Sequence, residues 1–239
     1  MAFRNAQQAR IYVGSFAASC YARTVSLDDS IDMLDVTTIC DAAKAYIPGT
    51  EGSGSFSIAG PLDSDGAATG QWATLTAQKA ATTPTPITYM PVGTDGAVWL
   101  VDGVHTNFDT TAAVGNTIDW SMQSTTTGAL DMNATVLSNN EAVTTTTNGS
   151  SIDGTAATTN GAVFHLHVTA FTGLTSDTIT IEDSSTGSSG WATIATFAAA
   201  TDVTSERVAI TGTVKRYVRI VDTVVGTGSI TRHISMARR

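Results

Sequence analysis

Residues 117–122 read Thr-Ile-Asp-Trp-Ser-Met, and apolar and polar side chains alternate one for one along this stretch. The same alternation returns at 130–136, Leu-Asp-Met-Asn-Ala-Thr-Val, and at 55–58, where Phe56 and Ile58 each follow a serine. Side chains two residues apart lie on the same face of a β-strand, so this pattern indicates strands with one buried face and one face in water. The sequence therefore predicts a mainly β fold.

Similar patterns extend the β prediction over both halves of the chain. They place further strands at 11–16, 87–90, 97–101, 164–168, 179–181, 208–210, 218–220 and 230–236. Trp72 and Leu75, which are three residues apart, suggest another turn of helix. Regular helix is otherwise expected at one place only.

That place is the segment 39–47. Ile39, Ala43 and Tyr46 have the spacing of one helix face, and Thr38 followed three residues later by Asp41 fits a capping box. Pro48-Gly49 would end the helix, because proline cannot continue it and glycine favours the turn that follows. One short helix beside many strands is the result.

The chain divides into two parts at a Thr-rich stretch. Residues 144–150 read Thr-Thr-Thr-Thr-Asn-Gly-Ser, and the surrounding segment has few large apolar side chains with which to fill a core. We therefore expect a first domain at 1–140, a linker at 141–160 and a second β domain at 161–239.

Composition limits the classes of function. The 239 residues are 42% hydrophobic and 14% charged, with a net charge of −9 and no uninterrupted apolar run of membrane-spanning length. A net anion attracts neither phosphate nor anionic lipid, which argues against a protein that grips duplex DNA or binds a membrane. Residues 1–140 carry 5 basic and 13 acidic side chains, whereas 141–239 carry 7 and 8, so the acidity belongs to the first part.

No pattern of residues predicts catalysis or metal binding. His165 and His167 share one strand face but have no third ligand at a fixed offset, so we expect two solvent-exposed histidines. Asp63-Ser64-Asp65-Gly66 begins like a calcium loop whose closing glutamate is missing, and Glu182 and Asp183 would point to opposite faces. We assign no catalytic, cofactor or metal residues and expect that the protein is not an enzyme.

Several single residues leave alternatives open. His105 could be structural or catalytic, and Trp191 follows a Ser/Gly-rich stretch that could expose it to a sugar. Lys215, Arg216, Arg219 and Arg232 could form a contact face, although a solvated strand face is favoured. Cys20 and Cys40 are expected to be buried free thiols, because the N-terminal segment does not have the long apolar core of a signal peptide.

The N-terminal part resembles the major tail tube proteins of long, non-contractile-tailed bacteriophages. The resemblance covers residues 1 to about 140 and consists of a strand with Tyr12, Val13 and Gly14, an acidic stretch at 28–35, the helix and a Gly-flanked strand at 54–60. The helix contributes the family-pattern residues Asp41, Lys44, Ile47, Pro48 and Gly49. Residues 116–137 resemble the closing hairpin of that fold, turning near 126–128, and 161–239 resembles the extra β-sandwich domains of some tail proteins.

This resemblance implies a tail-tube-type β-sandwich or barrel with one flanking α-helix, followed by a second β-sandwich domain. Such proteins assemble with copies of themselves into stacked, hexameric rings in the virion tail, after synthesis in the host cytoplasm. DNA passes through the lumen without specific binding, and a tape-measure protein and other tail proteins are partners. No cofactor and no membrane are implied.

A ring of acidic subunits would repel DNA phosphate and let the duplex slide. The residues that we expect to face the lumen are Asp119, Ser121, Asp131, Asn133 and Thr135. The alternative function is a carbohydrate or cell-surface binding β-sandwich on the virion exterior, using Trp191.

Overall fold

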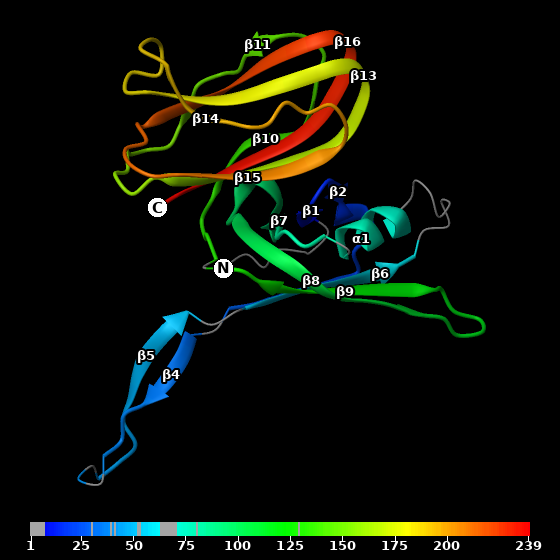
Figure 1. The fold of residues 1–239 in the computed structure, drawn as a ribbon, viewed down its shortest axis with the longest axis vertical. Coiled ribbons are helices and arrows are strands. Elements are labelled where there is room, and N and C mark those ends of the chain that lie inside the picture. Colours follow the sequence, from blue (N-terminus) through cyan, green and yellow to red (C-terminus); the bar gives the residue numbers. More distant parts are fainter. Residues whose placement is uncertain are drawn as a thin grey trace.

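The computed structural model describes residues 8–29, 31–38, 40, 42–51, 54–62, 71–79, 81–128 and 130–239. Within these residues the chain is mainly β, with two main sheets and one α-helix, as predicted. Figure 1 shows the two sheets stacked one above the other, with a narrow hairpin leading away from the lower one. None of the described helices is long and apolar enough to cross a membrane.

The first sheet has seven strands in the order β2-β1-β7-β8-β9-β6-β3. Their bounds are Arg10–Val13 (β1), Phe16–Ala17 (β2), Thr24–Asp28 (β3), Ser55–Pro61 (β6), Thr85–Met90 (β7), Trp99–Thr111 (β8) and Asp119–Thr126 (β9). Short 3-10 helices lie at Ala18–Cys20 (η2) and Gly93–Asp95 (η3).

Alternating side chains build the core of this sheet, as predicted for 55–58 and 119–122, whereas Ile118, expected on the same buried face, is 47% exposed. Phe56 and Ile58 of β6 and Trp120 and Met122 of β9 are buried, and the polar residues between them lie on the opposite face. The α-helix α1 (Gln71–Lys79) covers the buried face and adds Leu75 to the same cluster. The turn of helix suggested by Trp72 and Leu75 is therefore confirmed.

The predicted helix over 39–47 is wrong. Those residues belong to a hairpin, the arm, formed by β4 (Ile31–Asp35) and β5 (Tyr46–Glu51), in which Leu34 pairs with Ile47. Side chains at its end bind the backbone: Thr37 N–H donates to Asp35 Oδ1 at 2.9 Å, and Ala45 N–H donates to Thr37 Oγ1 at 3.0 Å. Such local bonds offer the backbone an alternative to helix. Ile39 and Asp41 lie outside the described residues.

The second sheet is built around two very long strands, β13 (Ala162–Ser184) and β16 (Tyr217–Arg238). Their antiparallel pairing runs from Ala162 opposite Arg238 to Ser184 opposite Tyr217, with three irregularities near the middle. The other strands are β10 (Thr135–Val143), β11 (Thr147–Asn148) and β12 (Ile152–Asp153) along β16, and β14 (Ala192–Thr196) and β15 (Thr204–Ile210) along β13.

Two sequence expectations fail where the chain changes sheets. Residues 116–137 do not form a hairpin, because β9 pairs with β6 and β8 whereas β10 pairs with β16. The stretch 130–136 is not one strand either: Asp131 bridges to Leu100, Asn133 has a positive φ of 59°, and β10 begins only at Thr135. Alternation alone does not reveal that such a segment leaves one sheet and joins another.

The stretch 141–160, expected to be a linker, carries the end of β10 together with β11 and β12, all paired with β16. It completes the second sheet at residue positions where the sequence has few large apolar side chains. Its pairings are made by the backbone, which requires no apolar residues. Where the chain divides into independently folding units stays a prediction.

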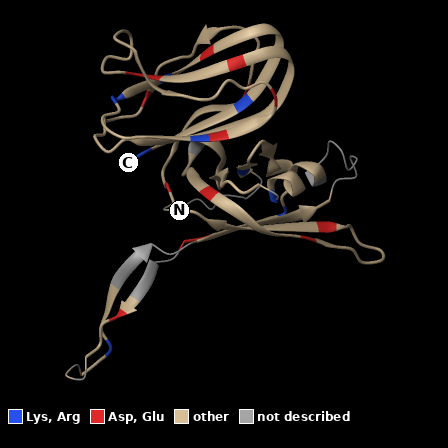
Figure 2. Cartoon of the chain, viewed as in Figure 1, with Lys and Arg blue, Asp and Glu red and all other residues tan. Residues whose placement is uncertain are grey.

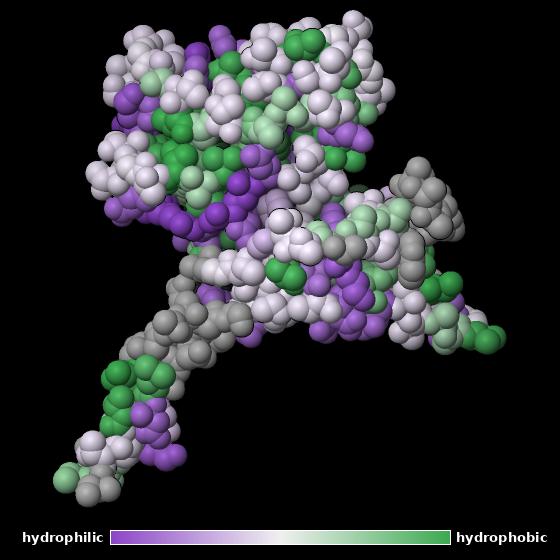
Figure 3. Space-filling view, in the orientation of Figure 1, coloured by the Kyte–Doolittle hydropathy of each residue, from purple (hydrophilic) through white to green (hydrophobic). Residues whose placement is uncertain are grey.

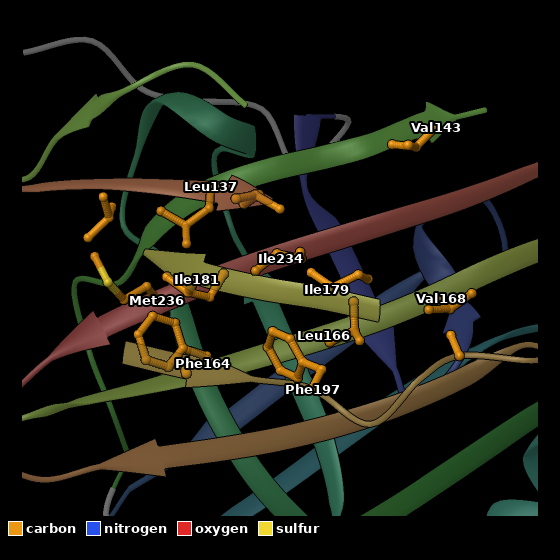
Figure 4. Close-up of a cluster of buried hydrophobic side chains, with 14 of the residues drawn as sticks. Leu137, Val143, Phe164, Leu166, Val168, Ile179, Ile181, Phe197, Ile234 and Met236 are labelled. Atoms are coloured by element: carbon orange, nitrogen blue, oxygen red, sulfur yellow. The ribbon is translucent and has the colours of Figure 1, made fainter. Parts of the chain in front are cut away.

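A large apolar cluster fills the second sheet and the strands around it. Figure 4 shows Phe164, Leu166 and Phe197 beside Ile234 and Met236, with Leu137 of β10 above them. A smaller cluster joins the two sheets, and its buried members are Tyr12, Met90, Val98, Leu100, Ala134, Val163 and Ala237.

Both cysteines are free, as expected, but both are exposed rather than buried. Cys20 ends the 3-10 helix η2, and Cys40 lies between the two strands of the arm. The surface position of these segments leaves the thiols in contact with solvent.

Candidate functional site

The arm is the most unusual surface of the molecule. It projects from the body into open space (Figure 1), and four large apolar side chains on it are exposed: Leu34, Val36, Tyr46 and Ile47, at 52%, 41%, 47% and 48%. Figure 3 shows apolar colour on the arm next to hydrophilic residues. A two-stranded hairpin with exposed apolar residues is marginally stable in water by itself, so the arm is suited to burial against another surface.

Cross-strand pairing distributes these side chains over both faces of the arm. Leu34 lies opposite Ile47 on one face, and Asp35 lies opposite Tyr46 on the other. The hydrogen bonds from Thr37 lower the pKa of the exposed Asp35 carboxyl. Residues 31–51 contain four acidic residues and one lysine, so any surface that covers the arm must accept both apolar contact and negative charge.

A second surface is the outer face of β3, β6, β9 and β8, which we name the polar face. Facing residues form rows across it, such as Ser26, Ser57, Gln123 and Asn107. The polar face consists of Thr24, Ser26, Asp28, Ser55, Ser57, Asn107, Asp109, Asp119, Ser121, Gln123 and Thr125. It combines short hydroxyl and amide side chains with three carboxylates.

The residues expected to face a lumen do not share one surface. Asp119 and Ser121 lie on the polar face, where Asp119 is 3.4 Å from the exposed Arg23 guanidinium. Asp131 lies near the other end of β8, opposite Leu100, and forms a two-bond ion pair with Arg239 at 2.9 Å. Asn133 and Thr135 are exposed where the chain passes to the second sheet.

The family-pattern residues fall into two groups. Tyr12 and Val13 are buried on β1, and Gly14 turns the chain towards β2 with a φ of +57°, where a Cβ would lie 2.4 Å from Gln78 Nε2. Lys44 and Ile47 are exposed on the arm rather than on a helix, and Pro48 and Gly49 lie on β5. Asp41 lies outside the described residues.

The histidines of β13 are not solvent-exposed, contrary to expectation. His165 and His167 are 1% and 0% exposed because the first sheet covers them, and Thr88 Oγ1 lies 3.5 Å and 2.8 Å from them. His105 is also buried, bonds to Ser124 Oγ at 2.7 Å, and has a pKa that burial lowers to about 4. These are structural positions, and the described residues contain no group of three or more side chains suited to a metal ion.

The basic residues near the C-terminus are engaged in ion pairs rather than forming a free patch. Lys215 pairs with Asp183 and Arg219 with Glu182, so these two adjacent acidic residues have separate partners. Arg216 pairs with Asp153, and the buried Arg232 with Asp222. Figure 2 shows charges of both signs spread along the strands of the second sheet.

Trp191 and the stretch 63–66 are the remaining candidate features. Trp191 is half-buried, and the Arg219 guanidinium carbon lies 4.5 Å from its ring centroid, over a face on which a sugar would stack. The stretch 63–66, which begins like a calcium loop, lies outside the described residues.

No family model matches the chain, and no curated protein matches it. Among solved structures, it is similar to the SPP1 Dit protein, described as a paradigm of the hub adsorption apparatus in phages that infect Gram-positive hosts. That similarity has a TM-score of 0.41 and 12% identity, and it covers 96% of this chain and 99% of that chain.

Two further similarities cover about half of the chain. One is to the tail of an empty gene transfer agent particle with C6 symmetry, with a TM-score of 0.43, 14% identity and coverage of 54% of this chain and 97% of that chain. The other is to the SPP1 tail tube, with a TM-score of 0.45, 8% identity and coverage of 55% and 79%.

The arm and the buried histidines were missed from the sequence for the same reason. Ile39, Ala43 and Tyr46 have the spacing of one helix face and so favour a helix over a hairpin, and a histidine pair on one strand face does not reveal what covers it. The side chains of Asp35 and Thr37 accept hydrogen bonds from the backbone at the end of the arm. These two residues are the signal in the sequence that favours a hairpin there.

Proposed function

We propose that the protein is a structural subunit of a phage-like tail, which self-assembles into stacked, ring-shaped layers of a tube. The observation that carries this proposal is the arm. Its four exposed apolar side chains lie on both faces of a hairpin that leaves the body. A neighbouring copy that covers the arm would remove this surface from water, and repeated contacts of that kind between unlike surfaces generate rings and stacks.

The polar face supports a role as the lumen of such a tube. Its side chains are short hydroxyls, amides and carboxylates, of which Asp28 and Asp109 repel phosphate, while the Arg23 guanidinium at its edge is paired with Asp119. Asp119 and Ser121 are our candidates for the lumen, with Asp131, Asn133 and Thr135 nearer the second sheet. Tape-measure and other tail proteins are the further partners in this proposal, and its chemistry is assembly rather than catalysis.

Substitution of the exposed cross-strand pair on the arm tests the proposal. The double variant Leu34→Ser, Ile47→Ser removes apolar area that a neighbouring copy would bury, while both positions are already exposed in the single chain. Losing about 1.4 kcal/mol or more per contact raises the concentration needed for assembly at least about tenfold. Light scattering after size exclusion and negative-stain microscopy of the purified protein measure this change.

The matched control is Val203→Ser, Val225→Ser, since these valines are 45% and 50% exposed but lie in the second half of the chain, away from the arm. The control should form rings and tubes as the unmodified protein does. An unmodified protein that stays monomeric at high concentration, or a Leu34→Ser, Ile47→Ser variant that assembles normally, contradicts the proposal.

A further inference from the structure

Three fully buried histidines lie at the junction, the region where the second sheet packs on β1 and β7 of the first. His167 of β13 lies directly opposite His233 of β16, with ring centroids 6.0 Å apart, and His165 is a further 6.0 Å from His167. His165 is 1% exposed, and His167 and His233 are 0% exposed. Three buried imidazoles in one contact between two sheets require a reason, because histidine changes charge near neutral pH.

Hydrogen bonds across the junction fix His167 in its neutral form. Its Nδ1 lies 2.6 Å from the Gly14 carbonyl oxygen, which can only accept, so Nδ1–H donates there. Its Nε2 lies 2.8 Å from Thr88 Oγ1 and accepts the hydroxyl proton. A second proton on Nε2 would force the Thr88 hydroxyl to turn and accept, leaving its own proton only the more distant His165 Nδ1 at 3.5 Å, and would place a charge on a ring that faces a carbonyl and a hydroxyl.

The His233 ring is stacked on another ring, and its buried surroundings disfavour the protonated form. Its ring lies on Tyr12 with centroids 4.2 Å apart and an angle of 14°, and its Nε2 bonds to Ser235 Oγ at 2.7 Å. Its Nδ1 is buried without a hydrogen-bond partner. Burial lowers the pKa of His233 to about 3 and that of His167 well below its usual value.

The charged groups around the junction do not offset a proton on these two rings. Asp102 of β8 lies 3.4 Å from His165 Nε2 and is already paired with Arg207 of β15 at 2.5 Å. Asp131 is paired with Arg239, and Arg10 is the charged group that acts on Tyr12 of β1. The carboxylates therefore serve His165 and the arginines, whereas His167 and His233 face a carbonyl, hydroxyls and an aromatic ring.

We propose that the junction is an acid-sensitive latch, in which protonation of His167 and His233 separates the first sheet from the second while each sheet stays folded. The pKa of each histidine is lowered in the closed state and returns to about 6.5 when water reaches it. The latch is therefore firmly closed above pH 6.5 and weakens as the pH falls. Uptake of two protons raises the opening constant about 100-fold per pH unit below that value.

Methionine oxidation measures this opening in the full chain. Met90 is buried at the junction, Met122 in the core of the first sheet and Met236 in the core of the second. Dilute hydrogen peroxide at pH 7.5 to 4, followed by mass spectrometry, should show the oxidation of Met90 rising steeply with acidity. Met122 and Met236 should stay protected. Protection of all three at every pH, or exposure of all three together, overturns the proposal.

Neutral replacements of His167 and His233 test whether these two residues take up the protons that open the junction. His233→Gln keeps a donor near Ser235 and His167→Asn keeps a donor near the Gly14 carbonyl, and each should reduce the pH dependence of Met90 oxidation to about 10-fold per unit. The double variant should abolish this pH dependence.

His105→Gln is the matched control, since His105 is buried inside the first sheet and bonds to Ser124 instead of crossing the junction. An unchanged pH dependence in the double variant overturns the proposal, and protection of Met122 and Met236 at pH 7.5 verifies that each variant is folded.

Discussion

Asp177 of β13 is completely buried and lies beside the Asp222 carboxylate of β16. Burial and the nearby Asp222 carboxylate raise its pKa to about 6, against the opposing effect of Arg232. Because this value lies above that of the unfolded chain, folding favours the protonated form. The stability that it contributes is complete below about pH 4 and is lost as the pH rises through 6.

We expect Asp177→Asn to stabilise the protein at pH 7.5 by roughly 2 kcal/mol, because the amide needs no proton to stay neutral. At pH 4 the variant and the unmodified protein should unfold at nearly the same urea concentration. Asp222→Asn is the contrasting variant: it breaks the buried pair with Arg232, whose two bonds are 2.8 Å and 2.6 Å long, and should cost about 3–5 kcal/mol. A destabilising Asp177→Asn at pH 7.5 would contradict this reading.

At this scale the sequence predicts which residues alternate but not what covers them. The buried positions of Phe56, Ile58, Trp120 and Met122 followed directly from a period of two. The burial of His165, His167 and Arg232 did not, because Thr88 of β7 contacts both histidines and Ser138 of β10 accepts a hydrogen bond from Arg232. Polar residues become core residues only when the topology supplies their hydrogen bonds.

Among the elements, β13 and β16 depend on glycine to continue past their irregular middle. Gly173 has a φ of +74°, and a Cβ there would lie 2.7 Å from the Thr227 carbonyl oxygen. One irregularity in the pairing with β16 spans this residue, between Thr172 and Leu174, and the next follows it, between Leu174 and Ser176. Glycine is therefore required at this position both by the positive φ and by the close approach of β16.

Gly173→Ala should destabilise the protein by about 2–4 kcal/mol, since it adds a steric clash to the strain of a positive φ. Gly190→Ala is the control: its φ is +67°, but no atom lies within 4 Å of the added carbon. That variant should cost only about 1 kcal/mol. Urea unfolding followed by circular dichroism compares them, and equal losses would show that the close contact with Thr227 is unimportant.

Element types were predicted correctly at 55–58 and 119–122 and wrongly at 39–47 and 130–134. The segment 39–47 matched a helix at three positions, yet side-chain bonds to the backbone at Asp35 and Thr37 favour the hairpin. Conversely, α1 was suggested by two apolar residues only. Short windows do not separate a period of 3.6 from an exposed hairpin with scattered apolar residues.

For the molecule as a whole, the two sheets are joined by one crossing of the chain between Thr126 and Thr135, together with the contacts of the junction. Fold class followed from composition and alternation. The position of the crossing did not, because it is fixed by long-range pairing of β10 with β16 rather than by a composition change at 141–160.

We expect a fragment of residues 135–239 to fold by itself, since it contains β10 to β16 and the large apolar cluster. A fragment of 161–239, which begins after the Thr-rich stretch, leaves β16 without β10 and Arg232 without Ser138 and Glu141. That fragment should aggregate or fail to show cooperative thermal unfolding. Equal behaviour of the two fragments would favour the boundary expected from the sequence.

The two exposed thiols have a practical consequence for any study of self-association. Cys40 stands between the strands of the arm and Cys20 at the surface of the first sheet, both unpaired. In concentrated, aerated solution such thiols oxidise to disulfides between molecules. Covalent dimers formed in this way would imitate an early step of ring growth. A reducing agent, or serine at both positions, therefore belongs in every assembly measurement, and a gel without reductant shows at once which kind of dimer is present.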